Sequence, residues 1–167
     1  MTATLIILGG LPGTGKTTIA KALAERVGAV HVRVDTIEQE LVRQGVPRES
    51  LDDKGYRIAY GVAVDNLRVG RIVIADTVNP VEQSRAAWRA AATGDGAAFI
   101  EVELFCSDAA THRARVEGRE GDIDGLCLPT WADVETREYE PWGGAMRFDT
   151  AASSPEDVAA KIAALLP

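Results

Sequence analysis

The chain has 167 residues, of which 46% are hydrophobic, and its formal net charge at pH 7 is −7. This length suits one compact domain that buries about two-thirds of the surface exposed by the unfolded chain, and it argues against a second domain. The acidic balance disfavours nucleic acids as partners, and no apolar run reaches the roughly 18 to 20 residues of a membrane span. Since the N-terminus also shows no signal-peptide pattern, we expect a single cytoplasmic domain, 1–167, with no membrane partner.

The first element is an apolar run at 5–8, which is typical of a buried strand, followed by Gly10-Leu-Pro-Gly-Thr-Gly-Lys-Thr17. This octapeptide matches the phosphate-loop pattern G-x-x-x-x-G-K-[ST] at every fixed position. The glycines let backbone N–H groups face phosphate oxygens, and the following helix presents its positive end to the same anion. Lys16 adds a mobile cation, and Thr17 offers a hydroxyl to Mg²⁺. We therefore expect ATP to contact Gly10, Gly13, Thr14, Gly15, Lys16, Thr17 and Thr18.

Strand and helix signals alternate along the rest of the chain, which predicts an α/β sheet with helices on both faces. Helical spacing of apolar residues predicts helices over 17–27, 36–43, 51–69, 81–92 and 108–119. Apolar runs predict strands over 29–34, 71–75 and 97–105, and a short edge strand over 147–149. Two capping boxes, Thr130-x-x-Asp133 and Ser154-x-x-Asp157, predict a short helix and a C-terminal helix.

Two acidic residues, Asp35 and Asp76, each terminate a predicted strand. In open α/β sheets the ligand lies beyond the carboxyl ends of the strands, so both carboxylates should face the same crevice as the phosphate loop. We expect Asp76 to reach Mg²⁺ through water, together with Thr17, or to orient the acceptor. The alternative is that Asp76 caps the turn at 77–80.

Two arginines, Arg115 and Arg119, are four residues apart on a predicted helix and should project from one face of it. Arginines delivered by a closing lid stabilise a transferring phosphoryl group and exclude water. Because glycines at 118, 121 and 125 supply hinge freedom, we expect a helical lid at approximately 115–130. A solvated charged face that includes Arg113 and Glu117 is the alternative.

The chain resembles the small-molecule kinases of the phosphate-loop class: the shikimate and gluconate kinases, adenylylsulfate kinase, chloramphenicol phosphotransferase and the zeta-toxin-like kinases. The matching features are the phosphate loop, Asp35-Thr-Ile-Glu38, Asn79-Pro80 with Arg85, and Arg115-x-x-x-Arg119. The resemblance implies a three-layer α/β/α P-loop NTPase fold, with a five-stranded parallel sheet of order 2-3-1-4-5 and a helical lid. The segment Asp76-Thr-Val-Asn79 lacks the glycine pair of the shikimate kinases, which argues against shikimate as the acceptor.

The resemblance also implies roles for two acceptor-binding residues. Asp35 would accept the proton of the acceptor hydroxyl, whereas the structural alternative is a helix cap. Arg85 would bind the acceptor, and its alternative is an exposed position on a helix. If the acceptor carries an anionic group, Arg33, Arg57 and Arg85 are the candidates to bind it.

The sequence thus predicts an ATP-dependent phosphotransferase that uses Mg²⁺ and moves the γ-phosphate of ATP to a hydroxyl of a small metabolite or antibiotic. The expected catalytic residues are Lys16, Asp35, Arg115 and Arg119, the substrate-binding residues are Asp35, Asp76 and Arg85, and the metal ligands are Thr17 and Asp76. A guanine-reading Asn-Lys-x-Asp is absent from the sequence, which disfavours a GTPase. The alternatives are a polynucleotide 5′-hydroxyl kinase, which would need a basic channel, and a nucleotide-binding regulatory protein without turnover.

Overall fold

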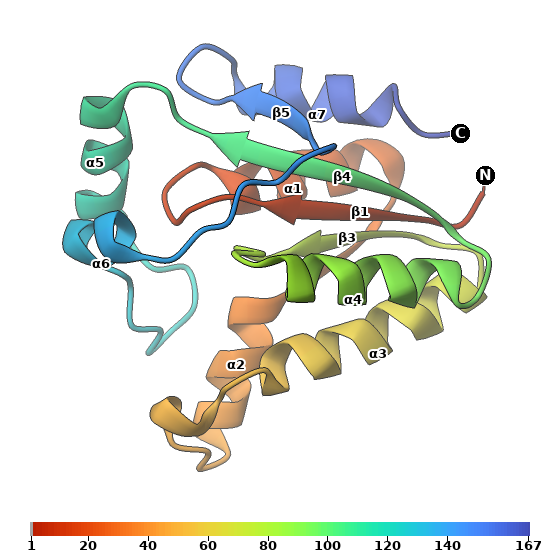
Figure 1. The fold of residues 1–167 in the computed structure, drawn as a ribbon, viewed down its shortest axis with the longest axis horizontal. Helices are drawn as coiled ribbons and strands as arrows, with labels where there is room; N and C mark the ends of the chain where they lie inside the picture. Colours follow the sequence, from red (N-terminus) through yellow and green to blue (C-terminus); the bar gives the residue numbers. More distant parts are fainter. Residues whose placement is uncertain (1) are drawn as a thin grey trace.

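Five parallel strands form one sheet in the order β2-β3-β1-β4-β5 in a computed structural model that describes residues 2–167. The strands are β1 (Thr4–Gly9), β2 (Val30–Arg33), β3 (Ile72–Asp76), β4 (Ala98–Phe105) and β5 (Met146–Asp149). Figure 1 shows β1, β3, β4 and β5 side by side, with their carboxyl ends pointing away from the two chain termini. The fold and strand order implied by the resemblance are confirmed.

The helices match the predicted elements with small shifts at their ends. They are α1 (Lys16–Val27), α2 (Val34–Arg43), α3 (Lys54–Arg68), α4 (Glu82–Thr93), α5 (Ala109–Glu117), α6 (Trp131–Thr136) and α7 (Pro155–Ala163), with a short 3-10 helix at Arg48–Ser50. Asp35 lies in the first turn of α2 rather than at the end of a strand. Its negative charge complements the positive end of the helix dipole there. Within residues 2–167, no helix combines the length and the apolar character needed to cross a bilayer.

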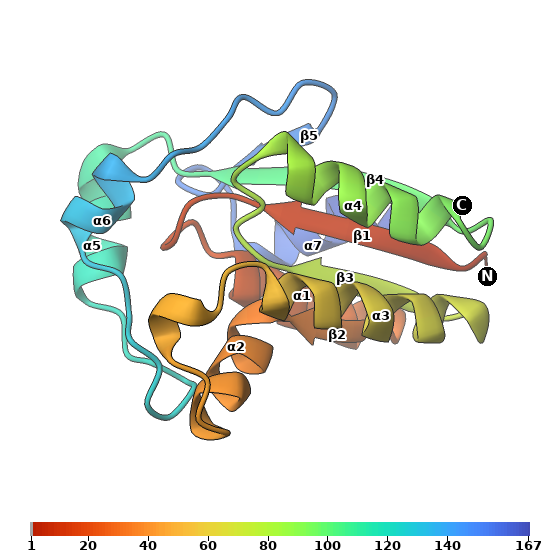
Figure 2. The ribbon, with the colours of Figure 1, turned by 60° about the horizontal axis from the view of Figure 1, so that its bottom comes forward.

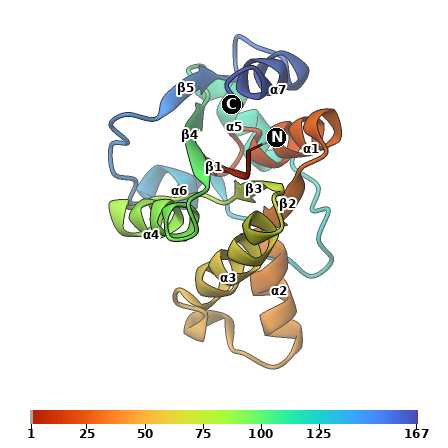
Figure 3. The ribbon, with the colours of Figure 1, turned by 90° about the vertical axis from the view of Figure 1, so that its right-hand side faces the viewer.

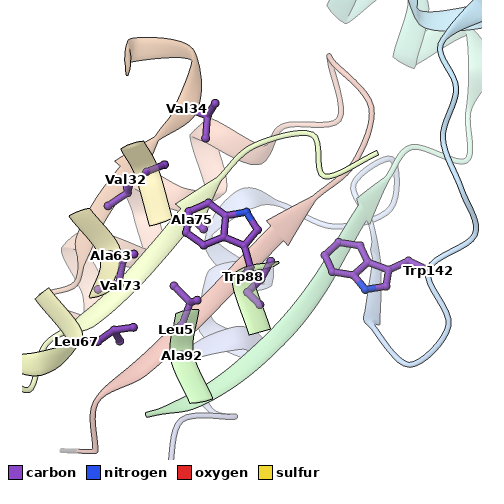
Figure 4. Packing of buried hydrophobic residues seen from close by; sticks show 12 residues of the cluster. Leu5, Val32, Val34, Ala63, Leu67, Val73, Ala75, Trp88, Ala92 and Trp142 are labelled. Atoms are coloured by element: carbon purple, nitrogen blue, oxygen red, sulfur yellow. The ribbon is translucent and has the colours of Figure 1, made fainter. Parts of the chain in front are cut away.

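The central strand β1 divides the core into two clusters. All six of its residues are buried, as expected of a parallel strand covered on both faces. Leu5 and Ile7 pack with α3 and α4, whereas Ile6 and Leu8 pack with α1 and α7. Figure 3 shows these helix pairs on opposite sides of the sheet. Trp88 of α4 is fully buried in the first cluster (Figure 4).

Side-chain caps begin three of the helices. The side chain of Asp108 accepts hydrogen bonds from the N–H groups of Ala110 and Thr111 at the start of α5. Thr130 and Asp133 form a complete capping box at α6, and Ser154 accepts from the N–H of Asp157 at α7. These caps satisfy helix N–H groups that have no partner within the helix.

Arg85 does not lie on an exposed helix face, and its donors contact backbone carbonyls rather than being free for an acceptor. Its side chain is fully buried on α4. The guanidinium donates to the carbonyl oxygens of Asn79 (2.9 Å), Glu140 (2.7 Å) and Pro141 (3.0 Å), and it lies 4.7 Å from the centroid of the Trp142 ring. Arg85 therefore fastens the segment 139–142 to the loop after β3, and we no longer assign it to substrate binding.

Replacing Arg85 with Met is expected to lower the free energy of unfolding by about 3 kcal/mol or more, because several buried carbonyls lose their donor. Urea unfolding followed by circular dichroism measures this change. Arg113→Met is the matched control, since Arg113 is exposed and pairs only with Glu117, and it should change stability by about 0.5 kcal/mol at most. Equal stability of the two variants would contradict the structural role of Arg85.

Candidate active site

A cleft of about 810 Å³ opens at the carboxyl end of the sheet. Its walls come from the loop between β1 and α1, the start of α2, the end of β3, and the segment between α5 and α6. Figure 2 shows that last segment beside α2. Most of the predicted site residues line this cleft, namely Gly13, Gly15, Lys16, Thr17, Thr18, Asp35, Asp76, Arg115 and Arg119.

The loop between β1 and α1 has a backbone that requires glycine. Gly10, Gly13 and Gly15 have φ angles of 143°, 82° and 89°. A Cβ atom on Gly13 would lie 2.5 Å from the Val116 side chain. No side chain caps α1 among the described residues, so the N–H groups at its first turn are free to bind an anion.

Two predicted ATP contacts, Gly10 and Thr14, lie behind the cleft wall and give the loop its shape. A Cβ atom on Gly10 would lie 2.2 Å from the carbonyl oxygen of Leu104. The Thr14 hydroxyl donates to the carbonyl of Leu11 at 2.8 Å and is buried. His112 of α5 contacts the loop from outside, with its Nε2 2.8 Å from the Pro12 carbonyl oxygen.

Lys16 places a buried ammonium group in the lining of the cleft. Its Nζ donates to the carbonyl of Leu11 at 2.9 Å. Burial lowers the pKa of Lys16 from 10.5 to about 8, with Asp76 and Asp35 opposing this change and Arg119 and Arg137 adding to it. An anionic ligand beside this ammonium group would favour its charged form and raise its pKa.

Asp76 lies at the base of the cleft with 3% of its surface exposed. Burial acts to raise its pKa, but hydrogen bonds with His31 and Thr17 and the positive charge of Lys16 lower the pKa below its usual value. The His31 Nε2 and the Asp76 carboxylate are 2.9 Å apart. An ionised carboxylate beside the Thr17 hydroxyl fits Mg²⁺, which prefers oxygen ligands and keeps several waters. The sequence offered no signal for the contact with His31, which joins neighbouring strands.

Asp35 and Glu38 are one helical turn apart on α2 and both line the cleft. Asp35 does not cap α2, because no side chain makes a capping hydrogen bond there. Burial and the charge of Asp35 raise the pKa of Glu38, while Arg137 and Arg48 act in the opposite direction. Gly55 of α3 gives Glu38 room, since a Cβ atom at that position would lie 2.4 Å from the Glu38 side chain.

Arg115 and Arg119 both line the cleft but do not project from one helix face. Helix α5 ends at Glu117, so Arg119 lies in the following loop. The chain leaves the helix at Gly118, a residue with low helix propensity. Arg115 donates to the hydroxyl of Thr150 at 3.0 Å and to its carbonyl at 2.9 Å. Arg115 therefore supports the loop before α7, whereas Arg119 places its charge near Lys16.

The cleft contains two arginines that sequence reasoning missed, Arg48 and Arg137. The arginines proposed from sequence for an anionic group lie elsewhere. Arg33 pairs with Asp122 at 2.9 Å, and Arg57 is exposed on α3 outside the cleft lining. No sequence motif marks Arg48, which follows α2, or Arg137, which follows α6, and the fold brings both into the lining of one cleft.

Comparisons with known proteins place this geometry in context. Residues 5–126 match a family model described as an AAA domain. An uncharacterised protein of Mycobacterium tuberculosis is 32% identical over 163 residues, which cover 90% of this chain and 32% of that protein, so the chain spans about a third of the length of that relative. An adenylyl-sulfate kinase of Picosynechococcus is 31% identical over 148 residues, covering 77% of this chain and 80% of the relative.

A solved structure shows the same fold over nearly the whole chain. It is that of the Mycobacterium tuberculosis APS kinase CysC in complex with AMPPNP and APS. The TM-score is 0.75 at 18% identity, and the match covers 98% of this chain and 97% of that one. Identity at this level establishes the shared fold and no more.

Replacing Lys16 with Met is expected to stabilise the nucleotide-free protein at pH 7 by roughly 2 to 3 kcal/mol, because it removes a buried charge whose pKa is depressed. The unfolded state holds this proton up to a higher pH, so the wild type gains stability as pH rises from about 8 to 10.5. The advantage of the variant should therefore shrink over that range. Urea unfolding at pH 7 and pH 10 measures it, with the exposed Lys161→Met as control. A variant that is less stable at pH 7 would contradict this account.

Proposed function

The chain belongs to the family of P-loop proteins described as an AAA domain, and we propose that it is an ATP-dependent kinase that phosphorylates a hydroxyl of a small molecule. One observation carries this proposal: Lys16, Asp76 and Asp35 line a single cleft, and the Asp35 carboxylate makes no side-chain hydrogen bond to residues 2–167. Phosphoryl transfer needs a phosphate cradle, a metal site and a group that accepts the proton of the attacking hydroxyl. The similarity to a relative named adenylyl-sulfate kinase supports this class of reaction.

The nucleotide would bind at the phosphate-loop side of the cleft. The N–H groups at the start of α1 would hold the phosphates. The flexible side chain of Lys16 would stay in contact with the negatively charged γ-phosphoryl group during transfer. Thr17 and Asp76 would hold Mg²⁺, which neutralises phosphate charge when bound. Thr150 and Pro155 line the same side of the cleft, and the bonds from Arg115 to Thr150 would steady this wall beside the nucleotide.

The acceptor would bind on the side of α2. Its hydroxyl oxygen forms a bond to the γ-phosphorus, the bond between that phosphorus and the bridging oxygen breaks, and ADP leaves. Asp35 takes the proton released by the hydroxyl. This role agrees with the position of Asp35, because its carboxylate is free to accept a hydrogen bond and lines the same cleft as Lys16.

Ion pairs and a hydrogen bond connect the segment proposed as the lid, approximately 115–130, to α1, β2 and α2. Asp122 pairs with Lys21 of α1 and with Arg33 of β2, each at 2.9 Å. The Arg43 guanidinium of α2 donates to the carbonyl of Asp124 at 2.7 Å. A lid in this position would exclude water from the transferring phosphoryl group and bring Arg119 toward it.

Asp35→Asn is expected to lower kcat by a factor of order 10² to 10⁴, because the amide cannot take the proton, while ATP affinity changes little. Coupled measurement of ADP release with an accepted alcohol gives kcat, and titration with an ATP analogue gives the affinity. Glu40→Gln on the exposed side of α2 serves as the control. An unchanged kcat in a folded Asp35→Asn variant would assign the proton to another group, with Asp76 the next candidate.

Arg119→Ala is expected to lower kcat by about 10²-fold or more while it weakens ATP binding less, because the charge on the phosphoryl oxygens grows in the transition state. Arg113→Ala removes an equal charge from the exposed side of α5 and should leave both quantities unchanged. Equal losses in ATP affinity and kcat would instead show that Arg119 acts on the ground state.

A further inference from the structure

The side of the cleft next to α2 holds an unusual set of charges, which we call the acceptor end: Asp35, Glu38, Arg48 and Arg137. Arg48 comes from the turn after α2, and Arg137 follows α6 on the far side of the lid segment. Both arginines influence the pKa of Glu38, so all four charges lie in one electrostatic neighbourhood. The acceptor end is therefore assembled from both walls of the cleft.

These charges are close to one another but remain unpaired. Among the described residues, no ion pair within 4.0 Å involves any of the four, and neither Arg137 nor Glu38 makes a side-chain hydrogen bond. Arg48 makes one hydrogen bond, from its NH2 to the Gln39 side-chain oxygen at 3.0 Å. Most of the N–H donors on the two guanidinium groups are consequently available to a ligand.

Three arginines outside the acceptor end are engaged by other groups of the protein. Arg33 and Arg89 pair with carboxylates, and Arg85 spends its donors on backbone carbonyls. Arg48 and Arg137 thus line the cleft with most of their N–H donors not bonded to other protein groups. Two such guanidiniums facing one cavity suit an oxyanion, to which arginine binds through paired, charge-assisted hydrogen bonds.

The two carboxylates supply the complementary half of the site. Asp35 and Glu38 are three residues apart on α2 and face the same side. Carboxylates accept hydrogen bonds from hydroxyl groups, so this pair suits an alcohol. A neutral alcohol would leave the guanidiniums without an anion, whereas a ligand with hydroxyl groups at one end and an oxyanion at the other would satisfy both halves.

We propose that the acceptor is a hydroxylated small molecule with one oxyanion group, which Arg48 and Arg137 bind while Asp35 receives the reacting hydroxyl. This inference rests on the proposed kinase function and adds the substrate class. Because Arg137 follows the lid segment and Arg48 follows α2, the anion would also join the two walls of the cleft and favour the closed position. Arg48 and Arg137 are then specificity-determining residues rather than participants in phosphoryl transfer.

The test compares pairs of alcohols that differ in the anion. D-gluconate with D-glucitol tests a carboxylate, glycerol phosphate with glycerol tests a phosphate ester, and D-glucose 6-sulfate with D-glucose tests a sulfate ester. Each compound is offered to the wild type with ATP, and phosphoryl transfer is followed with radiolabelled γ-phosphate. Binding is measured separately as the rise in Tm in the presence of a nonhydrolysable ATP analogue.

Three variants identify the residues responsible. Arg137→Met and Arg48→Met each remove a guanidinium from the acceptor end, and Arg57→Met removes the same charge from an exposed site on α3 as a control. For the anionic member of the preferred pair, we expect KM to rise at least about tenfold in the first two variants, as for loss of a charge-assisted contact. The KM for ATP and all constants of Arg57→Met should not change.

The outcomes separate this inference from the kinase function. Binding of an anionic compound that depends on Arg48 and Arg137, without any transfer, would support the inference and refute the proposed function. Transfer to neutral alcohols only, or no thermal shift with any anionic compound, would overturn the inference. Equal losses for the anionic and neutral members of a pair in Arg137→Met would also overturn it, since the contact would then not involve the anion.

Discussion

The buried ammonium group of Lys16 is the constraint around which the cleft is organised. Burial is the main cause of its depressed pKa, with Asp76 and Asp35 opposing the depression and Arg119 and Arg137 adding to it. Free N–H groups at the start of α1 place the positive end of the helix dipole in the same region. A phosphate group would supply the hydrogen-bond acceptors that these N–H groups lack, so a small acidic chain with a net charge of −7 can still offer a local site for an anion.

The rest of the fold holds this charge in place. Glycines with positive φ allow the loop to wrap, and His112 fixes the outside of the loop at Pro12 while its ring packs edge-on against Trp131 of α6. The phosphate loop is thereby in contact with the two helices that flank the lid. Asp122 and Asp124 fasten the other end of that lid to α1, β2 and α2. Binding of phosphate and closure of the proposed lid would thus act on one connected set of contacts.

The two ends of the cleft follow different physical rules. At the proposed nucleotide end, recognition would come from backbone N–H groups and one lysine, which depend on a short local motif. At the proposed acceptor end, recognition would come from side chains that belong to α2, the turn after it and the segment after α6. A change in any of these side chains would alter the acceptor without disturbing ATP, as expected of a fold on which many related activities are built.

Local sequence determined much of this protein. The phosphate loop, the alternation of strands and helices, the capping residues Asp108 and Thr130, and the buried anchor Trp88 all follow from patterns that act within a few residues. The sheet order and the small-molecule kinase class came from resemblance to known kinases and were confirmed. Tertiary structure alone decided which arginines enter the cleft: Arg85, near the matching Asn79-Pro80, became a buried clamp, while Arg48 and Arg137, which no motif marks, face the cavity. The physical reason is that a guanidinium can donate to carbonyl, carboxylate and ligand oxygens, so the packing around it decides which of these it meets.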